Sequence, residues 1–174
     1  MAPSHRGRSM SVTRRPDPAP TLPVDPDSVP RESGPLHVRP SAIAAVAAGG
    51  LLGAPLRYGL GVAFPTSAGQ FPWTTFAINI AGALLLGCLL EALTRLGDDA
   101  GWRRRLRLCL GTGVLGSFTT YSTLAVDTDL LVRDHHLGSA ALYAVASVIA
   151  GLLATTAGIA VGAQVRTRRV EVSR

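Results

Sequence analysis

A run of small and hydroxyl-bearing residues, GTGVLGSFTTYSTL from Gly111 to Leu124, carries the clearest chemistry in the chain. It holds three glycines and six serine or threonine hydroxyls inside an uncharged, largely apolar segment. Glycine is a poor helix former, and a dense Ser/Thr run offers the backbone competing hydrogen bonds. In lipid, irregular backbone persists only where protein buries it or where it lines a wet cavity. The pattern therefore predicts a broken membrane helix built around an ion site.

The alternative for the same run is a helix-packing face, because Gly, Ser and Thr are also enriched where membrane helices approach closely. Packing accounts for one or two such residues per turn. It accounts poorly for hydroxyls at nearly every position from Ser117 to Thr123, so the ion site is the preferred interpretation.

Two further polar residues, Asn79 and Arg57, lie inside apolar stretches. The amide of Asn79 either bridges two helices or points an NH2 donor at an anion, and Thr75 and Gly82 share its face at helical spacing. An arginine at the bilayer centre costs roughly 2.5–3.5 kcal/mol on insertion scales, so Arg57 should face protein, water or the interface. It either gives an anion a positive field or snorkels to the headgroups from a helix end. Both alternatives stay open for each residue.

The elements that must position these residues are membrane helices. Only 16% of the residues are charged, and no charge falls within 58–90, 108–126 or 137–165. A soluble domain cannot hide such runs, because a surface helix needs a polar face. The four histidines lie in predicted tails or loops, and two cysteines make neither a disulfide framework nor a metal cluster. No catalytic triad and no phosphate-binding loop can be drawn, so an enzyme is not expected.

We expect an all-α membrane protein with four transmembrane helices, the third of them broken in mid-membrane. A Pro- and Arg-rich tail over 1–40 has too little apolar content to fold. The helical domain over 41–165 is followed by a basic tail over 166–174. The expected helices cover 41–62, 73–94, 106–131 and 137–163.

The arginines predict the orientation of these helices. Apart from Arg57 and Arg133, every arginine lies in the first tail, in the loop between the second and third helices with its flanks, or in the last tail. With four helices these three regions share one side of the membrane. The positive-inside rule then puts both termini in the cytoplasm.

Three blocks in this order resemble the CrcB/Fluc fluoride channel family. The block GGLLGAPLRYGL, Gly49 to Leu60, is similar to the family pattern GGxxGAxxRY. The block FPWTTFAINIAGALLLG, Phe71 to Gly87, is similar to its pattern PxGTxxVNxxG. The run that begins at Gly111 is similar to GTGxxGGxTTFSTF, and it is the most specific of the three.

The resemblance implies subunits that pair antiparallel in a bacterial plasma membrane, as a dual-topology-type dimer with two fluoride pores. It implies a structural Na+ at the centre, held by the backbone carbonyls of Gly116 and Thr119 from each subunit. Arg57 matches the family's arginine of the first helix and would support the pore. The function implied is passive export of F−, which lowers cytoplasmic fluoride. The implied pore residues are Asn79, Tyr121, Ser122, Thr123, Tyr143 and Ser147.

Three features depart from the family pattern. Tyr121 and Leu124 stand where the family has two pore phenylalanines, and Leu124 offers no aromatic ring edge to an anion. Ser117 replaces the second glycine of a pair beside the sodium site. The one-sided arginines do not suit a subunit that inserts both ways, so we expect a fixed orientation. We therefore expect a homologous partner of opposite orientation, which makes an antiparallel heterodimer.

Two other functions remain as alternatives. A small multidrug-resistance-type transporter also has four helices, but it needs an intramembrane carboxylate to couple protons to substrate. Glu91, Asp127 and Asp129 are expected near helix ends. The other alternative is a non-conducting partner subunit in a membrane assembly.

Overall fold

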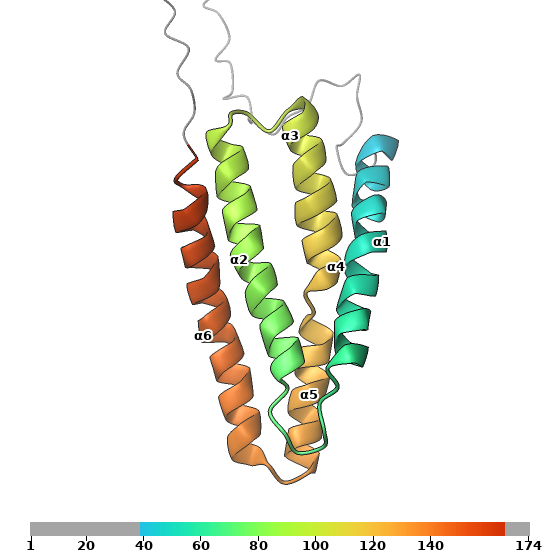
Figure 1. The fold of residues 1–174 in the computed structure, drawn as a ribbon, viewed down its shortest axis with the longest axis vertical. Helices are drawn as coiled ribbons and strands as arrows, with labels where there is room; N and C mark the ends of the chain where they lie inside the picture. Colours follow the sequence, from blue (N-terminus) through green and yellow to red (C-terminus); the bar gives the residue numbers. More distant parts are fainter. Residues whose placement is uncertain (1–38, 166–174) are drawn as a thin grey trace, which may run out of the picture. The chain divides into compact units, whose positions relative to one another are not determined.

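The computed structural model describes residues 39–165, and every regular element in that range is helical. The two predicted tails fall almost wholly outside the described residues. Figure 1 shows α1 (Pro40–Ala63), α2 (Trp73–Arg95) and α6 (Leu137–Gly162) as three long helices. All three are long and apolar enough to cross a membrane, and their bounds lie within one residue of those predicted. The chain is accordingly a multi-pass membrane protein.

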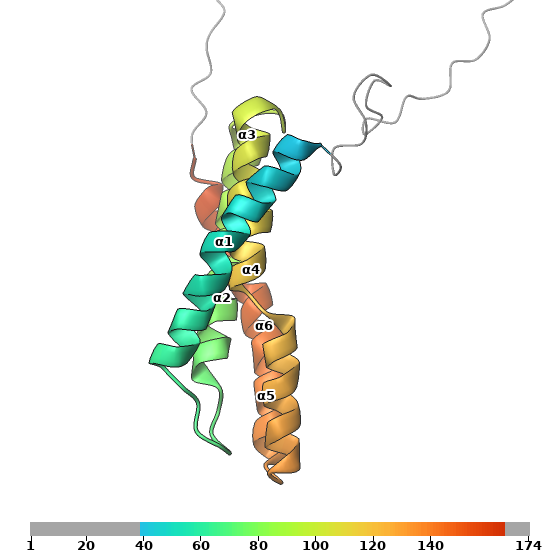
Figure 2. The same cartoon turned by 90° about the vertical axis from the view of Figure 1, so that its right-hand side faces the viewer.

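The segment between α2 and α6 is the irregular one. It begins with α3 (Gly101–Leu106) and continues as a π-helix, η2 (Arg107–Leu115), which contains Gly111 and Gly113. The short α4 (Gly116–Phe118) and then α5 (Tyr121–Arg133) complete it. Between α4 and α5 the trace leaves the helical path, as Figure 2 shows. The break that the sequence predicts is therefore present, and it leaves no continuous helix of spanning length in this segment.

Glycines let the helices approach closely in two pairs. Where α1 meets η2, a Cβ added to Gly113 would lie 2.7 Å from the Val46 carbonyl oxygen and 2.8 Å from Gly49 Cα. Where α2 meets α6, a Cβ added to Gly162 would lie 2.6 Å from the Cys88 carbonyl oxygen. Only a residue without a side chain allows such backbone contact, as is common between membrane helices. These crossings hold α1 against η2 and α2 against α6.

The buried core of the described chain is small. Leu131, Ala140 and Tyr143 form its centre, and Phe71, Phe76 and Leu124 pack against it. Many large apolar side chains elsewhere are exposed, among them Leu51 and Leu152. In a membrane protein such side chains face lipid or a partner subunit, so their exposure on the surface of the single chain is expected.

Candidate functional site

The site is built around two extended residues, Thr119 and Thr120. Thr119 has ψ 159°, and Thr120 has φ −151° and ψ 124°, so neither continues the helix. The last helical bond before the break runs from Thr119 N to the Leu115 carbonyl at 3.0 Å. A break of this kind leaves backbone donors and acceptors that need other partners.

Asn79 on α2 supplies partners on both sides of the Thr120 peptide. Its Nδ2 donates to the Thr120 carbonyl at 2.9 Å, and Thr120 N donates to its Oδ1 at 2.8 Å. The amide therefore bridges α2 to the break, as one of its two predicted alternatives requires. An NH2 group has two donors, so one N–H of Asn79 remains beyond this pair. The side chain can serve the backbone and still offer a proton to a ligand.

The break also frees carbonyl oxygens at the end of α4. Thr120 N is taken by Asn79 and Thr123 N by the Thr120 hydroxyl, so the Gly116 and Thr119 carbonyls lose the amides that a continuous helix would supply. Oxygen atoms of this kind are the ligands that a hard cation prefers. The donor set at Gly116 and Thr119 thus fits a small cation.

Arg57 lies half-buried and reaches the same region from α1. Its Nε donates to the Ser117 carbonyl at 3.1 Å. A guanidinium held by backbone does not extend to the headgroups, so the snorkelling alternative loses its support. The positive charge stays next to the carbonyls of the break, where it stabilises their negative ends.

The hydroxyls around the break fall into two groups. Those of Ser117 and Thr119 donate back to carbonyls of their own turn, to Gly113 at 2.7 Å and to Leu115 at 2.9 Å. Those that follow the break form a network: Thr120 Oγ1 lies 3.0 Å from Thr123 Oγ1 and 3.1 Å from Ser122 Oγ. Thr120 also accepts from Thr123 N and so caps α5. Only the second group is free to reorganise around a ligand.

A groove of about 320 Å³ opens beside the break. It is bordered by Asn79, Thr119, Thr120 and Tyr121, and Leu124 lies on its apolar side. Tyr121 is 82% exposed, which leaves its ring free for a partner or a ligand. The groove brings together Asn79 of α2 with Tyr121 and Leu124 of α5, whereas Ser122 and Thr123 lie outside its lining.

Tyr143 and Ser147 are buried residues of α6 that do not line this groove, and Tyr143 belongs to the buried cluster with Leu131 and Ala140. Tyr143 is fully buried, and its hydroxyl donates to Asp127 Oδ2 at 3.3 Å. The ring of Phe71 meets the Tyr143 ring edge-on, with centroids 5.2 Å apart. Ser147 Oγ is buried and has no hydrogen-bond partner among the described residues. A buried hydroxyl without a partner is uncommon and indicates a place for a polar ligand or water.

Asp127 lies within two turns of the end of α5, near a helix end as expected, and it lines a small pocket with residues 66–70 of the loop between α1 and α2. The sequence interpretation missed its partner, because the half-buried carboxylate accepts from the Tyr143 hydroxyl at 3.3 Å. The available signal was its spacing of four residues from Thr123, which puts both side chains on one helical face. Thr155 of α6 was also missed, although it lines the groove.

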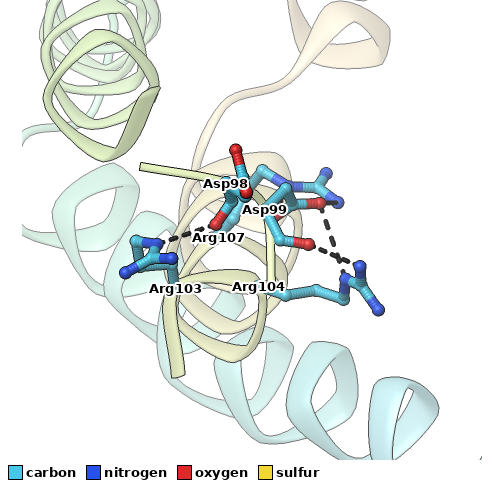
Figure 3. Close-up of polar contacts among 5 residues, drawn as sticks. All are labelled: Asp98, Asp99, Arg103, Arg104 and Arg107. Carbon is cyan, nitrogen blue, oxygen red and sulfur yellow. Dashed lines mark hydrogen bonds and ion pairs between the residues drawn. The ribbon is translucent and has the colours of Figure 1, made fainter. Parts of the chain in front are cut away.

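The loop between α2 and α3 and the residues that follow it form a charged cluster (Figure 3). Figure 1 shows this loop at the opposite end of the helices from α5. Arg107 donates to the Asp99 carboxylate from Nε at 3.1 Å and from Nη2 at 2.7 Å. The hydrogen bonds from Arg107 hold the pKa of Asp99 below its ordinary value, with help from the charge of Arg104. Glu91 pairs with Arg95 at 2.6 Å, as expected for an acid that meets arginines there. This cluster anchors the loop.

Comparison with known proteins places this geometry in a family. The family model described as "CrcB-like protein, Camphor Resistance (CrcB)" matches residues 44–159. A Leifsonia xyli protein named fluoride-specific ion channel FluC 2 is 48% identical over 80% of this chain and 95% of its own. Streptomyces avermitilis FluC 3 is 44% identical over 79% of this chain and 66% of its own. Novosphingobium aromaticivorans FluC is 46% identical over 70% of this chain and 95% of its own. The chain belongs to the CrcB-like family of channel proteins and is not an enzyme.

Proposed function

We propose that this chain is a subunit of a fluoride-specific ion channel that lets F− leave the cytoplasm passively. The observation that carries the proposal is the break at Thr119–Thr120. There, one groove adjoins carbonyls without helical partners, the Asn79 amide with one N–H still unused, and a network of hydroxyls. The names of the relatives, all fluoride-specific ion channels, agree with it.

Fluoride is small and hard, so a pore must replace its water with several donors at once. The second N–H of Asn79 and the hydroxyls of Ser122 and Thr123 would supply donors beside the break. The unpartnered Ser147 hydroxyl would supply another along α6. Tyr143 would line the path beside it, with its one O–H proton donated to Asp127. The exposed ring of Tyr121 would present its positive edge to the anion. No bond has to be broken, so the chain needs only to hold these donors in place.

The carbonyls of Gly116 and Thr119 would hold a structural Na+, one set from each subunit. When bound, the ion would supply positive potential and fix the ends of the broken helix. Ser117 does not obstruct this site, because its hydroxyl is bonded back to the Gly113 carbonyl. Gly116 is exposed in the single chain, so a second subunit can approach it.

We propose that the second subunit is a homologue of opposite orientation. The exposed Gly116 and Tyr121 leave the site open on the side where a partner would complete it. In the part of the chain that the structure describes, the loop from Arg95 to Arg107 is strongly basic, whereas the opposite connections carry only Arg133. This asymmetry favours one orientation, with both termini in the cytoplasm of a bacterial cell.

The test is fluoride efflux from liposomes, measured with a fluoride electrode. The full chain is reconstituted alone and together with a homologous subunit of the opposite charge bias. We expect strong efflux only from the pair. Full efflux from the chain alone would contradict the heterodimer, and no efflux from either preparation would contradict the channel itself.

A proton-coupled transporter of the small multidrug-resistance type is a second candidate because of Asp127. A half-buried carboxylate that accepts from Tyr143 resembles the intramembrane acid that such transporters need. The two mechanisms differ in their response to a proton gradient. Efflux that is unchanged by an imposed pH difference supports the channel, and fluoride uptake driven by that difference would support the transporter.

A non-conducting partner subunit is the remaining alternative, and Leu124 decides it. Leu124 packs against the cluster around Tyr143 and offers no ring edge to the groove. We expect Leu124→Phe to raise fluoride efflux of the heterodimer severalfold, because it adds a second ring edge to the pore. The matched control is Leu130→Phe on the exposed face of α5. Equal efflux from both variants would mean that this subunit's own pore is silent.

A further inference from the structure

An apolar groove of about 560 Å³ lies between α1 and the stretch made of α3 and the first part of η2, away from the break at Thr119–Thr120. Its α1 wall is made by Ala42, Ile43, Val46 and Ala47, which recur at the spacing of one helical face. Its other wall carries Leu108 and Thr112, and its end carries two guanidiniums, those of Arg104 and Arg107. The groove is thus apolar along its length and cationic at one end.

The cationic end is not neutralised by its own loop. Arg104 and Arg107 share a single carboxylate, that of Asp99. Arg107 spends two of its donors on Asp99, and Arg104 gives one Nη2 bond to the Asp99 carbonyl. A guanidinium has five N–H donors, so both side chains keep donors for a further anion. Their side chains are 32% and 38% exposed, so part of each guanidinium is accessible, although Arg104 Nε is buried.

The length of the groove matches one leaflet of a membrane. From Arg104 to Thr112 the chain advances eight residues, and because most of this stretch is the π-helix η2, it is at most about 12 Å long, the length of an α-helix of that size. One leaflet contributes about 15 Å of hydrocarbon. The arginines therefore lie at headgroup depth when the apolar part of the groove lies among the acyl chains.

We propose that this groove binds one anionic phospholipid, with its phosphate on Arg104 and Arg107 and an acyl chain between α1 and η2. The site is independent of fluoride conduction and of the proposed ion sites. Charge complementarity selects the headgroup, since guanidinium forms strong paired hydrogen bonds to phosphate. The apolar walls select a lipid over a free phosphate.

The test is native mass spectrometry of the full-length protein released from detergent, with added phosphatidylglycerol or phosphatidylcholine of the same acyl chains. We expect phosphatidylglycerol to bind more tightly. Arg104→Gln should weaken that preference about fivefold, as expected for one basic residue at an anionic membrane surface. Arg105→Gln, an equal change of charge on the exposed side of α3, is the control and should have little effect.

A second variant tests the apolar part without touching the charges. Ala47→Leu fills the groove and should displace the lipid, whereas Ala44→Leu, outside the lining on the same helix, should not. Glycerophosphoglycerol, the headgroup without acyl chains, should fail to compete. Equal binding of both lipids, equal losses in Arg104→Gln and Arg105→Gln, or normal binding by Ala47→Leu would each overturn the proposal. Lipid bound only to monomers would also overturn it, because the groove would then belong to a second subunit.

Discussion

At the scale of single residues, Asn79 has two tasks that are usually separate. Its Oδ1 and one N–H hold the peptide of Thr120, and its other N–H is the one that we propose meets the ion. The half-buried Asn79 amide uses its oxygen and one N–H for these two bonds. Loss of either bond would leave a backbone group of Thr120 unpaired, so the side chain fixes the geometry of the break. The break is therefore held open by a side chain and not by strain.

We expect Asn79→Asp to lower fluoride efflux from the proposed heterodimer by about tenfold or more. The carboxylate can still accept from Thr120 N, but it cannot donate to the Thr120 carbonyl and it repels an anion. Efflux per reconstituted protein, with dimer content checked by size-exclusion chromatography, measures the effect.

Thr128→Val is the matched control for loss of a polar group in this region. The Thr128 hydroxyl bonds only the Leu124 carbonyl of its own helix, so efflux should stay close to that of the unmodified protein. Normal efflux from Asn79→Asp would remove Asn79 from the pore.

At the scale of elements, the fold depends on glycine contacts between helices and not on a large core. The buried cluster around Tyr143 serves only the α5 end. Elsewhere, backbone meets backbone at Gly49 and Gly113 and at Gly87 and Gly162. In lipid, where apolar helices gain little by leaving their solvent, such close packing provides much of the association energy.

We expect Gly113→Ala to destabilise the protein by about 1–3 kcal/mol, the usual cost of overpacking a tight contact. The new methyl group would lie 2.7 Å from the Val46 carbonyl oxygen, so α1 and η2 must move apart. Gly50→Ala is the control, since a Cβ there meets nothing within 4 Å. Thermal unfolding in detergent should show a lower midpoint for Gly113→Ala and an equal or higher midpoint for Gly50→Ala. Equal midpoints would contradict the role of this crossing.

Much of this element pattern could be predicted from the sequence. The expected bounds of α1, α2 and α6 lie within one residue of those in the structure, and the Gly and Ser/Thr run predicts the break. The partner of the break could not be predicted, because Asn79 and Thr120 lie 41 residues apart and only the fold brings them together. The partner of Asp127 could not be predicted for the same reason, because the facing Tyr143 lies 16 residues away in the chain.

At the scale of the whole molecule, the arrangement of charge and the open site point to the same assembly. The basic loop from Arg95 to Arg107 lies at one end of the helices, and the opposite end carries acidic groups and Arg133. The site at the break is exposed on one side, at Gly116 and Tyr121. The heterodimer that we propose rests on these two features: a subunit of fixed orientation with an incomplete site would need a partner inserted the other way, and a second copy would not provide that orientation.

This requirement predicts the topology of the chain when it is expressed alone. A green fluorescent protein fused to the C-terminus should fluoresce, and alkaline phosphatase fused there should be inactive, because the C-terminus should stay in the cytoplasm. Replacing Arg103 and Arg105 by Gln, while adding Gly138→Arg and Ser139→Arg at the other end, should make both reporters active. Replacing Arg103 and Arg105 by Lys keeps the charge and should keep one orientation. If the unmodified chain activates both reporters, it inserts both ways, and an antiparallel homodimer would then suffice.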